Sequence, residues 1–110
     1  MDEEGRVVVE RCEIASSFFA RLRGLLGRSG LEPGEGLMIT RSGSIHTAFM
    51  RFPIDAVFLD RDLRVRKVVA AMPPFRAAAA RRSRQVLELA AGEAERAGIV
   101  VGLRLAWQDR

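Results

Sequence analysis

The amino-acid sequence predicts a small, mainly β protein of the α+β type: an antiparallel β-sandwich or barrel with one or two short peripheral helices. Apolar residues come in runs of about five, a length typical of buried strands. Long regular helices do not separate these runs, which argues against a doubly wound parallel sheet. The chain has 110 residues, of which 48% are hydrophobic. Because this supports one core but not two, we expect a single domain over residues 1–110.

The first part of the chain predicts a strand, a helix and a second strand. Three valines stand in a row at 7–9, and β-branched residues favour a pleated, half-buried surface. Apolar side chains then recur at helical spacing over 18–27, with arginines on the other faces. The segment 31–36 is rich in turn-forming residues, and it leads into a short apolar run at 36–40 that predicts a strand.

The central part of the chain predicts a β-hairpin. Two apolar runs, 56–60 and 65–71, flank a polar connection at 60–62. The second arm ends at the two prolines at 73–74, because proline cannot donate a hydrogen bond to a β-ladder.

The last third of the chain combines short strands with helical turns. Four alanines at 77–80 have high helix propensity, but in so short a run a single helical turn and an exposed loop are equally compatible with them. The segment 85–90 predicts a strand, and the glycine-bounded segment 92–98 predicts one or two helical turns. Residues 99–107 predict a closing β segment.

The positive charge is concentrated in the middle of the chain. The net charge is +4, which divides into −2 for residues 1–40, +7 for 41–84 and −1 for 85–110. The densest stretch, Arg76 to Arg84, holds four arginines and no acid, and arginine can bind phosphate groups of nucleic acid in a bidentate manner. However, 17 of the 18 cationic side chains are arginine, which indicates a chain-wide preference. We therefore favour a solvated basic loop over a nucleic-acid interface.

Several classes of protein are excluded by simple counts. Cys12 is the only cysteine, so an internal disulfide and a cysteine-based zinc site are excluded. No apolar stretch approaches the roughly 18 residues that a membrane helix needs. The acidic start Met-Asp-Glu-Glu is the reverse of a secretory signal, and we expect a cytoplasmic protein. No spacing encodes a metal site, and we expect neither a metal nor a cofactor.

Three polar residues are candidates for chemistry. His46 is the sole histidine and could act as a general base near neutral pH. Asp55 enters an apolar strand and Glu88 stands between two leucines, so each carboxylate needs a partner if it is buried. In one interpretation both face inward, pair with arginines such as Arg28 or Arg51 and fix strand register. In another they act with His46 in catalysis, and strand alternation could also place Glu88 in solvent.

Three blocks of sequence are similar, in order and spacing, to motifs of the domain of unknown function 192 family. They are RLRGLLGR and GLMI at 21–28 and 36–39, a central block at 45–60, and VLELAAG at 86–92 with glycines at 98 and 102. In the central block, Asp55 and Phe58 fall on the family's Asp and Phe, whereas His46 and Thr47 stand where the family has Trp-Met. The resemblance covers roughly residues 16–107.

This resemblance implies a compact β-rich fold with a helix around Arg21 at its side, and it implies no activity, because the family has no established one. It draws attention to five positions: Arg21, Arg28, Asp55, Glu88 and Gly92.

Taken together, these features predict a module that binds a small ligand or a protein partner without catalysis, as a monomer or weak homo-oligomer. The candidate binding residues are polar side chains of the first two blocks: Arg21, Arg28, His46, Thr47 and Arg51. One alternative is a hydrolase-type enzyme that uses His46 with Asp55 or Glu88. The other is nucleic-acid binding through the basic segment Arg76 to Arg84.

Overall fold

The computed structural model describes residues 11–15, 31–32, 34–40, 43–46 and 52–106. These residues form β-strands and one short helix, in agreement with the mainly β fold predicted from the sequence. In chain order the elements are β1 (Arg11–Ala15), β2 (Glu35–Thr40), β3 (Ser44–His46), β4 (Ile54–Leu59), β5 (Val65–Met72), β6 (Ala77–Ala79), β7 (Gln85–Ala90) and α2 (Glu93–Arg96). The strand predicted at 7–9 and the helix predicted at 18–27 lie outside the described residues.

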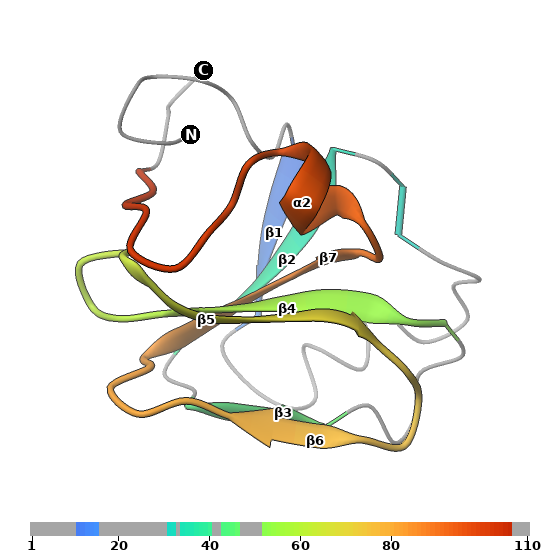
Figure 1. The fold of residues 1–110 in the computed structure, drawn as a ribbon, viewed down its shortest axis with the longest axis horizontal. Helices are drawn as coiled ribbons and strands as arrows, with labels where there is room; N and C mark the ends of the chain where they lie inside the picture. The colour runs from blue at the N-terminus through green and yellow to red at the C-terminus, as the bar shows by residue number, and fades with distance from the viewer. Residues whose placement is uncertain (1–10, 16–30, 33, 41–42, 47–51, 107–110) are drawn as a thin grey trace.

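The strands form two sheets. The larger has five strands in the order β1-β2-β7-β4-β5, and β3 pairs with β6 in the smaller one. All pairs are antiparallel except β1 with β2, which is parallel. Figure 1 shows the β3–β6 pair on one side of the larger sheet and α2 on the other. Within the described strands the larger sheet is open, which favours the sandwich over the closed barrel.

The central strand β4 carries a core on each of its faces. All six of its residues are buried, as expected of a strand flanked by β5 and β7 and covered on both sides. The inter-sheet core consists of Leu31, Leu37, Ile39, Ile45, Phe52, Ile54, Ala56, Phe58, Met72 and Val86. The α2-side core consists of Met38, Val57, Leu59, Val65, Leu87, Leu89, Ala94, Ile99 and Leu105. Alternate residues of β4 therefore belong to different cores.

Two segments differ from the sequence prediction. Residues 77–79 form a strand, because pairing with β3 satisfies their backbone groups where a four-alanine helix would be too short to be stable alone. Of the closing β segment predicted at 99–107, the described residues form isolated bridges at Arg104 and Leu105, and Arg104 pairs with Arg64. There the Val65 amide donates to the Leu103 carbonyl at 2.8 Å, so the segment covers the start of β5 without extending the sheet.

The complete burial of β4 predicts a large cost for removing a large side chain from this strand. Phe58 has 0% exposure, and Phe58→Ala is expected to lower the free energy of unfolding by about 3–5 kcal/mol in urea denaturation, since it leaves a cavity. Phe75 is 74% exposed and supplies the matched control. Phe75→Ala is expected to change the free energy of unfolding by less than about 0.5 kcal/mol. Equal effects of the two changes would contradict this description of the core.

Candidate functional site

Asp55 is a buried carboxylate whose two oxygens are both bound by backbone amides. It is 1% exposed. Its Oδ1 accepts a hydrogen bond from the Ala71 amide at 2.8 Å, and its Oδ2 accepts one from the Ala94 amide at 2.9 Å. The sequence correctly indicated that this carboxylate needs partners. The arginines considered for that role, Arg28 and Arg51, lie outside the described residues. Backbone N–H groups fill that role, and such bonds to a carboxylate are stronger than neutral ones.

These two bonds join β4 to two irregular segments. Ala71 has a φ of 49° and lies where the β4–β5 register shifts, so the Asp55 carboxylate fixes a β-bulge. Ala94 lies in the first turn of α2, whose N-cap residue Gly92 has a φ of 91° and supplies no side-chain cap. Asp55 therefore caps α2 from a distant part of the chain, with its negative charge at the positive end of the helix.

Glu88 lies on β7, next to β4, but faces the opposite way. It has 0% exposure and is in register with Leu37 on one side and Ala56 on the other, two residues of the inter-sheet core. Asp55 is in register with Leu89 of the α2-side core. Since paired residues of antiparallel strands project to the same face, the two carboxylates point to opposite faces of the sheet. They do not form the shared charge network considered from the sequence.

The position of β3 bears on which of the two carboxylates could lie near His46. This residue belongs to β3, which packs through Ile45 on the inter-sheet core, the face to which Glu88 points. Asp55 faces away from that layer. The His46 side chain lies outside the described residues, as do Arg21, Arg28, Thr47 and Arg51. Roles for these residues in binding or catalysis therefore stay predictions.

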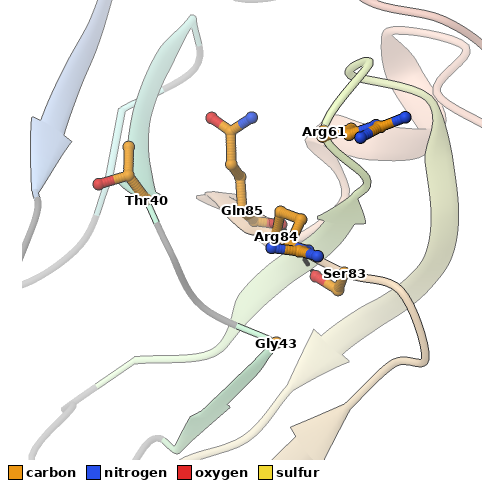
Figure 2. Close-up of a pocket in the computed structure, with 6 residues that line it drawn as sticks. All are labelled: Thr40, Gly43, Arg61, Ser83, Arg84 and Gln85. Atoms are coloured by element: carbon orange, nitrogen blue, oxygen red, sulfur yellow. Dashed lines mark hydrogen bonds between the residues drawn. The ribbon is translucent and has the colours of Figure 1, made fainter.

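A pocket that sequence reasoning missed lies at the opposite end of β4 and β7 from Asp55. Its volume is about 580 Å³. The described residues that line it come from turns and strand ends: Thr40, Gly43, Arg61, Ser83, Arg84 and Gln85 (Figure 2). Thr40 and Gln85 are register partners on β2 and β7, so the sheet itself places their polar side chains on the same face.

One wall of the pocket is the β4–β5 turn, which is held by Asp60. The Asp60 Oδ1 accepts hydrogen bonds from the Asp62 amide at 2.9 Å and the Arg64 amide at 3.1 Å, an arrangement typical of an aspartate-stabilised turn. Burial raises the pKa of Asp60, but these two backbone donors and the charges of Arg66 and Arg64 outweigh it, so the net pKa is lowered. The ionised Asp60 thus fixes the turn that carries Arg61.

The facing wall is the β6–β7 turn. The Ser83 amide donates to the Ala80 carbonyl at 3.3 Å, and the Ala80 amide donates to the Gly43 carbonyl at 3.1 Å. A Cβ at Gly43 would lie 3.2 Å from the Ser83 carbonyl oxygen, so the close approach of these segments favours glycine. The Arg84 amide donates to the Leu59 carbonyl at 2.8 Å, which ties the turn to β4. Both walls are therefore anchored by backbone bonds, independently of the arginine side chains.

The described arginine side chains fall into two groups. Five have a partner in the protein: Arg64 on the Gly102 carbonyl, Arg66 on Asp60, Arg76 on the Phe75 carbonyl, Arg96 on Glu93 and Arg104 on the Asp62 carbonyl. Four others make no hydrogen bond or ion pair in the described part of the chain: Arg61, Arg81, Arg82 and Arg84. Two of these four line the pocket, and the other two form the exposed tip of the β6–β7 turn beside it. Among the described residues, the unpartnered positive charge is thus gathered at one end of the larger sheet.

Among the residues that the structure describes, no three His, Cys, Asp or Glu side chains form a group that could hold a metal ion. None of the described helices is long and apolar enough to cross a membrane.

The fold and this pocket define a small, mainly β module with a basic depression at one end of its larger sheet. A family model, DUF192, described as "Uncharacterized ACR", matches residues 1–107, and the chain belongs to this family. The resemblance found in the three sequence blocks is therefore confirmed.

Two solved structures are similar to this chain. A protein of unknown function from Novosphingobium aromaticivorans is 27% identical, with a TM-score of 0.77 over 87% of this chain and 74% of that one. A protein from Sinorhizobium meliloti described as a "putative transcription regulator" is also 27% identical, with a TM-score of 0.76 over 86% of this chain and 79% of that one. A search of curated proteins gave no match.

The double role of Asp55 predicts a loss of stability when its carboxylate is removed. Asp55→Ala leaves the amides of Ala71 and Ala94 without an acceptor, and it is expected to lower the free energy of unfolding by roughly 1–3 kcal/mol. Asp62→Ala, at an exposed aspartate, is the control and is expected to have little effect. A melting temperature unchanged by Asp55→Ala would show that the carboxylate does not hold these segments.

Glu93 gives α2 a pH-dependent attachment. The Arg96 guanidinium donates to both Glu93 oxygens, which lowers the pKa of Glu93 despite burial, and the Gly34 amide donates to Oε1 at 3.2 Å and lowers it further. A lowered folded-state pKa adds stability above the ordinary value of 4.5, and this stability is lost as the pH falls through the folded-state value. Glu93→Gln is therefore expected to be less stable than wild type at neutral pH, by less than about 1 kcal/mol because Arg96 is largely exposed.

Thermal melts at a series of pH values check this expectation. The difference between wild type and Glu93→Gln is expected to shrink as the pH falls below 4.5. If the difference in stability between the two proteins grew as the pH fell, the stabilising role assigned to ionised Glu93 would be refuted.

Proposed function

We propose that this protein is a binding module that holds a small anionic ligand in the pocket between the β4–β5 and β6–β7 turns, without chemical turnover. The observation that carries the proposal is that two arginines, Arg61 and Arg84, both line this pocket. Neither guanidinium has a protein partner in the described part of the chain, although five other arginines do. Positive side chains that stand unpaired in one concave site favour an anion.

The remaining lining residues suit an anion as well. The Thr40 hydroxyl and the Gln85 amide can each donate a hydrogen bond, and guanidinium groups bind carboxylate or phosphoryl oxygens through two parallel bonds. The Ser83 hydroxyl lies 3.1 Å from the Gln85 carbonyl oxygen and donates to it, so it supports the wall of the pocket. Because the main chain anchors both turns, the backbone positions that carry these donors are fixed before a ligand arrives, which reduces the entropic cost of binding.

Binding without turnover is supported by what the described lining lacks. Its residues include neither a carboxylate nor an imidazole, so a general base is not among them. The two candidate carboxylates, Asp55 and Glu88, are buried within the sheet. Asp55 in addition uses both oxygens for structural bonds.

Nucleic acid is the alternative anion to be tested, because the similar Sinorhizobium meliloti protein is described as a "putative transcription regulator". We favour a small ligand. Binding of single strands combines a basic track with aromatic side chains on which bases stack. Here the exposed aromatic Phe75 and the unpartnered arginines Arg81 and Arg82 lie at opposite ends of β6. We further propose a cytoplasmic setting and a monomer or weak homo-oligomer, as the sequence favours.

The proposal predicts that anion binding depends on the pocket arginines. Isothermal titration calorimetry at low ionic strength with sodium phosphate, sulfate and acetate is expected to show binding of at least one anion. Arg84→Ala is expected to weaken it about tenfold, because a charge-assisted hydrogen bond is lost. Arg76→Ala removes the same charge outside the lining and is expected to leave the affinity within about twofold. Absence of binding by all three anions, or equal effects of the two variants, would overturn the proposal.

A further inference from the structure

We infer that the ligand of this pocket carries a dianionic phosphoryl group, an inference that rests on the proposed anion-binding function. The argument starts from the amount of unpartnered positive charge. One carboxylate carries a single charge, and a single arginine fork satisfies its two oxygens. The pocket offers two free guanidinium groups in its lining, those of Arg61 and Arg84, which is more than a carboxylate requires.

The tip of the adjacent β6–β7 turn adds two more guanidinium groups. Arg81 and Arg82 are its exposed central residues, since the Ser83 amide closes the turn on the Ala80 carbonyl. Arg82 has a φ of 62°, a conformation that glycine or asparagine adopts more readily. The turn therefore carries a long cationic side chain where its backbone favours a smaller residue. Its two charges lie beside the pocket and raise the positive potential at the pocket mouth.

The acidic groups nearby do not cancel this charge. The carboxylates of the facing turn are those of Asp60 and Asp62. Asp60 is already engaged by two backbone amides and lies 4.0 Å from the Arg66 guanidinium. Among the described residues of these two turns, Asp62 alone is left to oppose the four unpartnered arginines, which leaves an excess of about three positive charges. A doubly charged ligand matches this excess better than a singly charged one.

The hydrogen-bond donors of the lining point to the same chemistry. A phosphate monoester presents three terminal oxygens, each able to accept more than one hydrogen bond. Two guanidinium forks, the Thr40 hydroxyl and the Gln85 amide can supply donors to all three. A phosphodiester of a nucleic-acid backbone has only two such oxygens and one charge. The number of donors therefore favours a terminal phosphoryl group on a small molecule over an internal backbone phosphate.

The test uses the titration of the ligand. A phosphate monoester loses its second proton near pH 6, so raising the pH from about 5 to about 7.5 increases the dianion fraction about tenfold. Calorimetry with glycerol 3-phosphate is expected to show an affinity that rises about tenfold over this range. Sulfate is a dianion throughout this pH range and therefore serves as the control for changes in the protein, and its affinity is expected to stay constant. Acetate and a short thymidine oligonucleotide without a terminal phosphate are expected to bind at least tenfold more weakly than glycerol 3-phosphate at the higher pH.

Two sets of variants distinguish the contribution of the lining arginines to the affinity from that of the arginines at the tip of the β6–β7 turn. Arg61→Gln and Arg84→Gln are expected to remove most of the affinity for glycerol 3-phosphate, and Arg81→Gln with Arg82→Gln to reduce it severalfold in low salt. Binding of acetate as tightly as glycerol 3-phosphate, or a pH dependence shared by sulfate, would overturn this inference while leaving the proposed anion site intact. Tighter binding of the oligonucleotide would overturn it in favour of nucleic acid. Absence of binding by every probe would overturn both proposals.

Discussion

The carboxylate of Asp55 is the interaction on which much of this structure depends. A buried charge is tolerated only where donors meet it, and here the donors come from a bulge of β5 and from the first turn of α2. The helix has four residues and a glycine at its N-cap, so little in its own sequence would hold it on the sheet. By binding Ala94, Asp55 fixes the position of α2 against the α2-side core. The central strand thereby determines the position of elements on both sides of it.

The two ends of the larger sheet consequently have different characters. At the Asp55 end, polar groups are paired with one another and the chain is tied together. At the other end, the β4–β5 and β6–β7 turns are held by their backbone bonds, and within the described part of the chain four of their arginine side chains project without partners: Arg61, Arg81, Arg82 and Arg84. This division is common where a rigid scaffold presents residues on loops for binding. It explains how the same sheet can provide stability at one end and a site for a charged ligand at the other.

The sequence predicted those features that depend on local chemistry. Apolar runs located β4, β5 and β7, and the Asp60 turn followed from its residue types. The apolar neighbours of Asp55 and Glu88 indicated that each carboxylate would need a partner if buried, but the sequence left Glu88 open between the core and solvent, because the face that a residue occupies depends on register. The partners of Asp55 are backbone amides, which any residue could supply, so nothing in the sequence marks Ala71 or Ala94. The pocket was missed for a related reason: its lining comes from separate turns and strand ends, and only strand pairing brings Arg61 near Arg84. Likewise, residues 77–79 become a strand because β3 pairs with them.

The alternation of β4 between two cores bears on how the chain folds. If β4 paired one residue out of register, Asp55 would turn into the inter-sheet core, away from the amides of Ala71 and Ala94, and apolar residues would exchange cores. The buried carboxylate thus acts as a check on register, because a slipped sheet leaves it without donors. One of its two donors, the Ala94 amide, lies 39 residues from Asp55 in the sequence. Contacts over such separations are typical of folds that form slowly. The Asp55 carboxylate has both of its donors only when α2 has docked on the sheet.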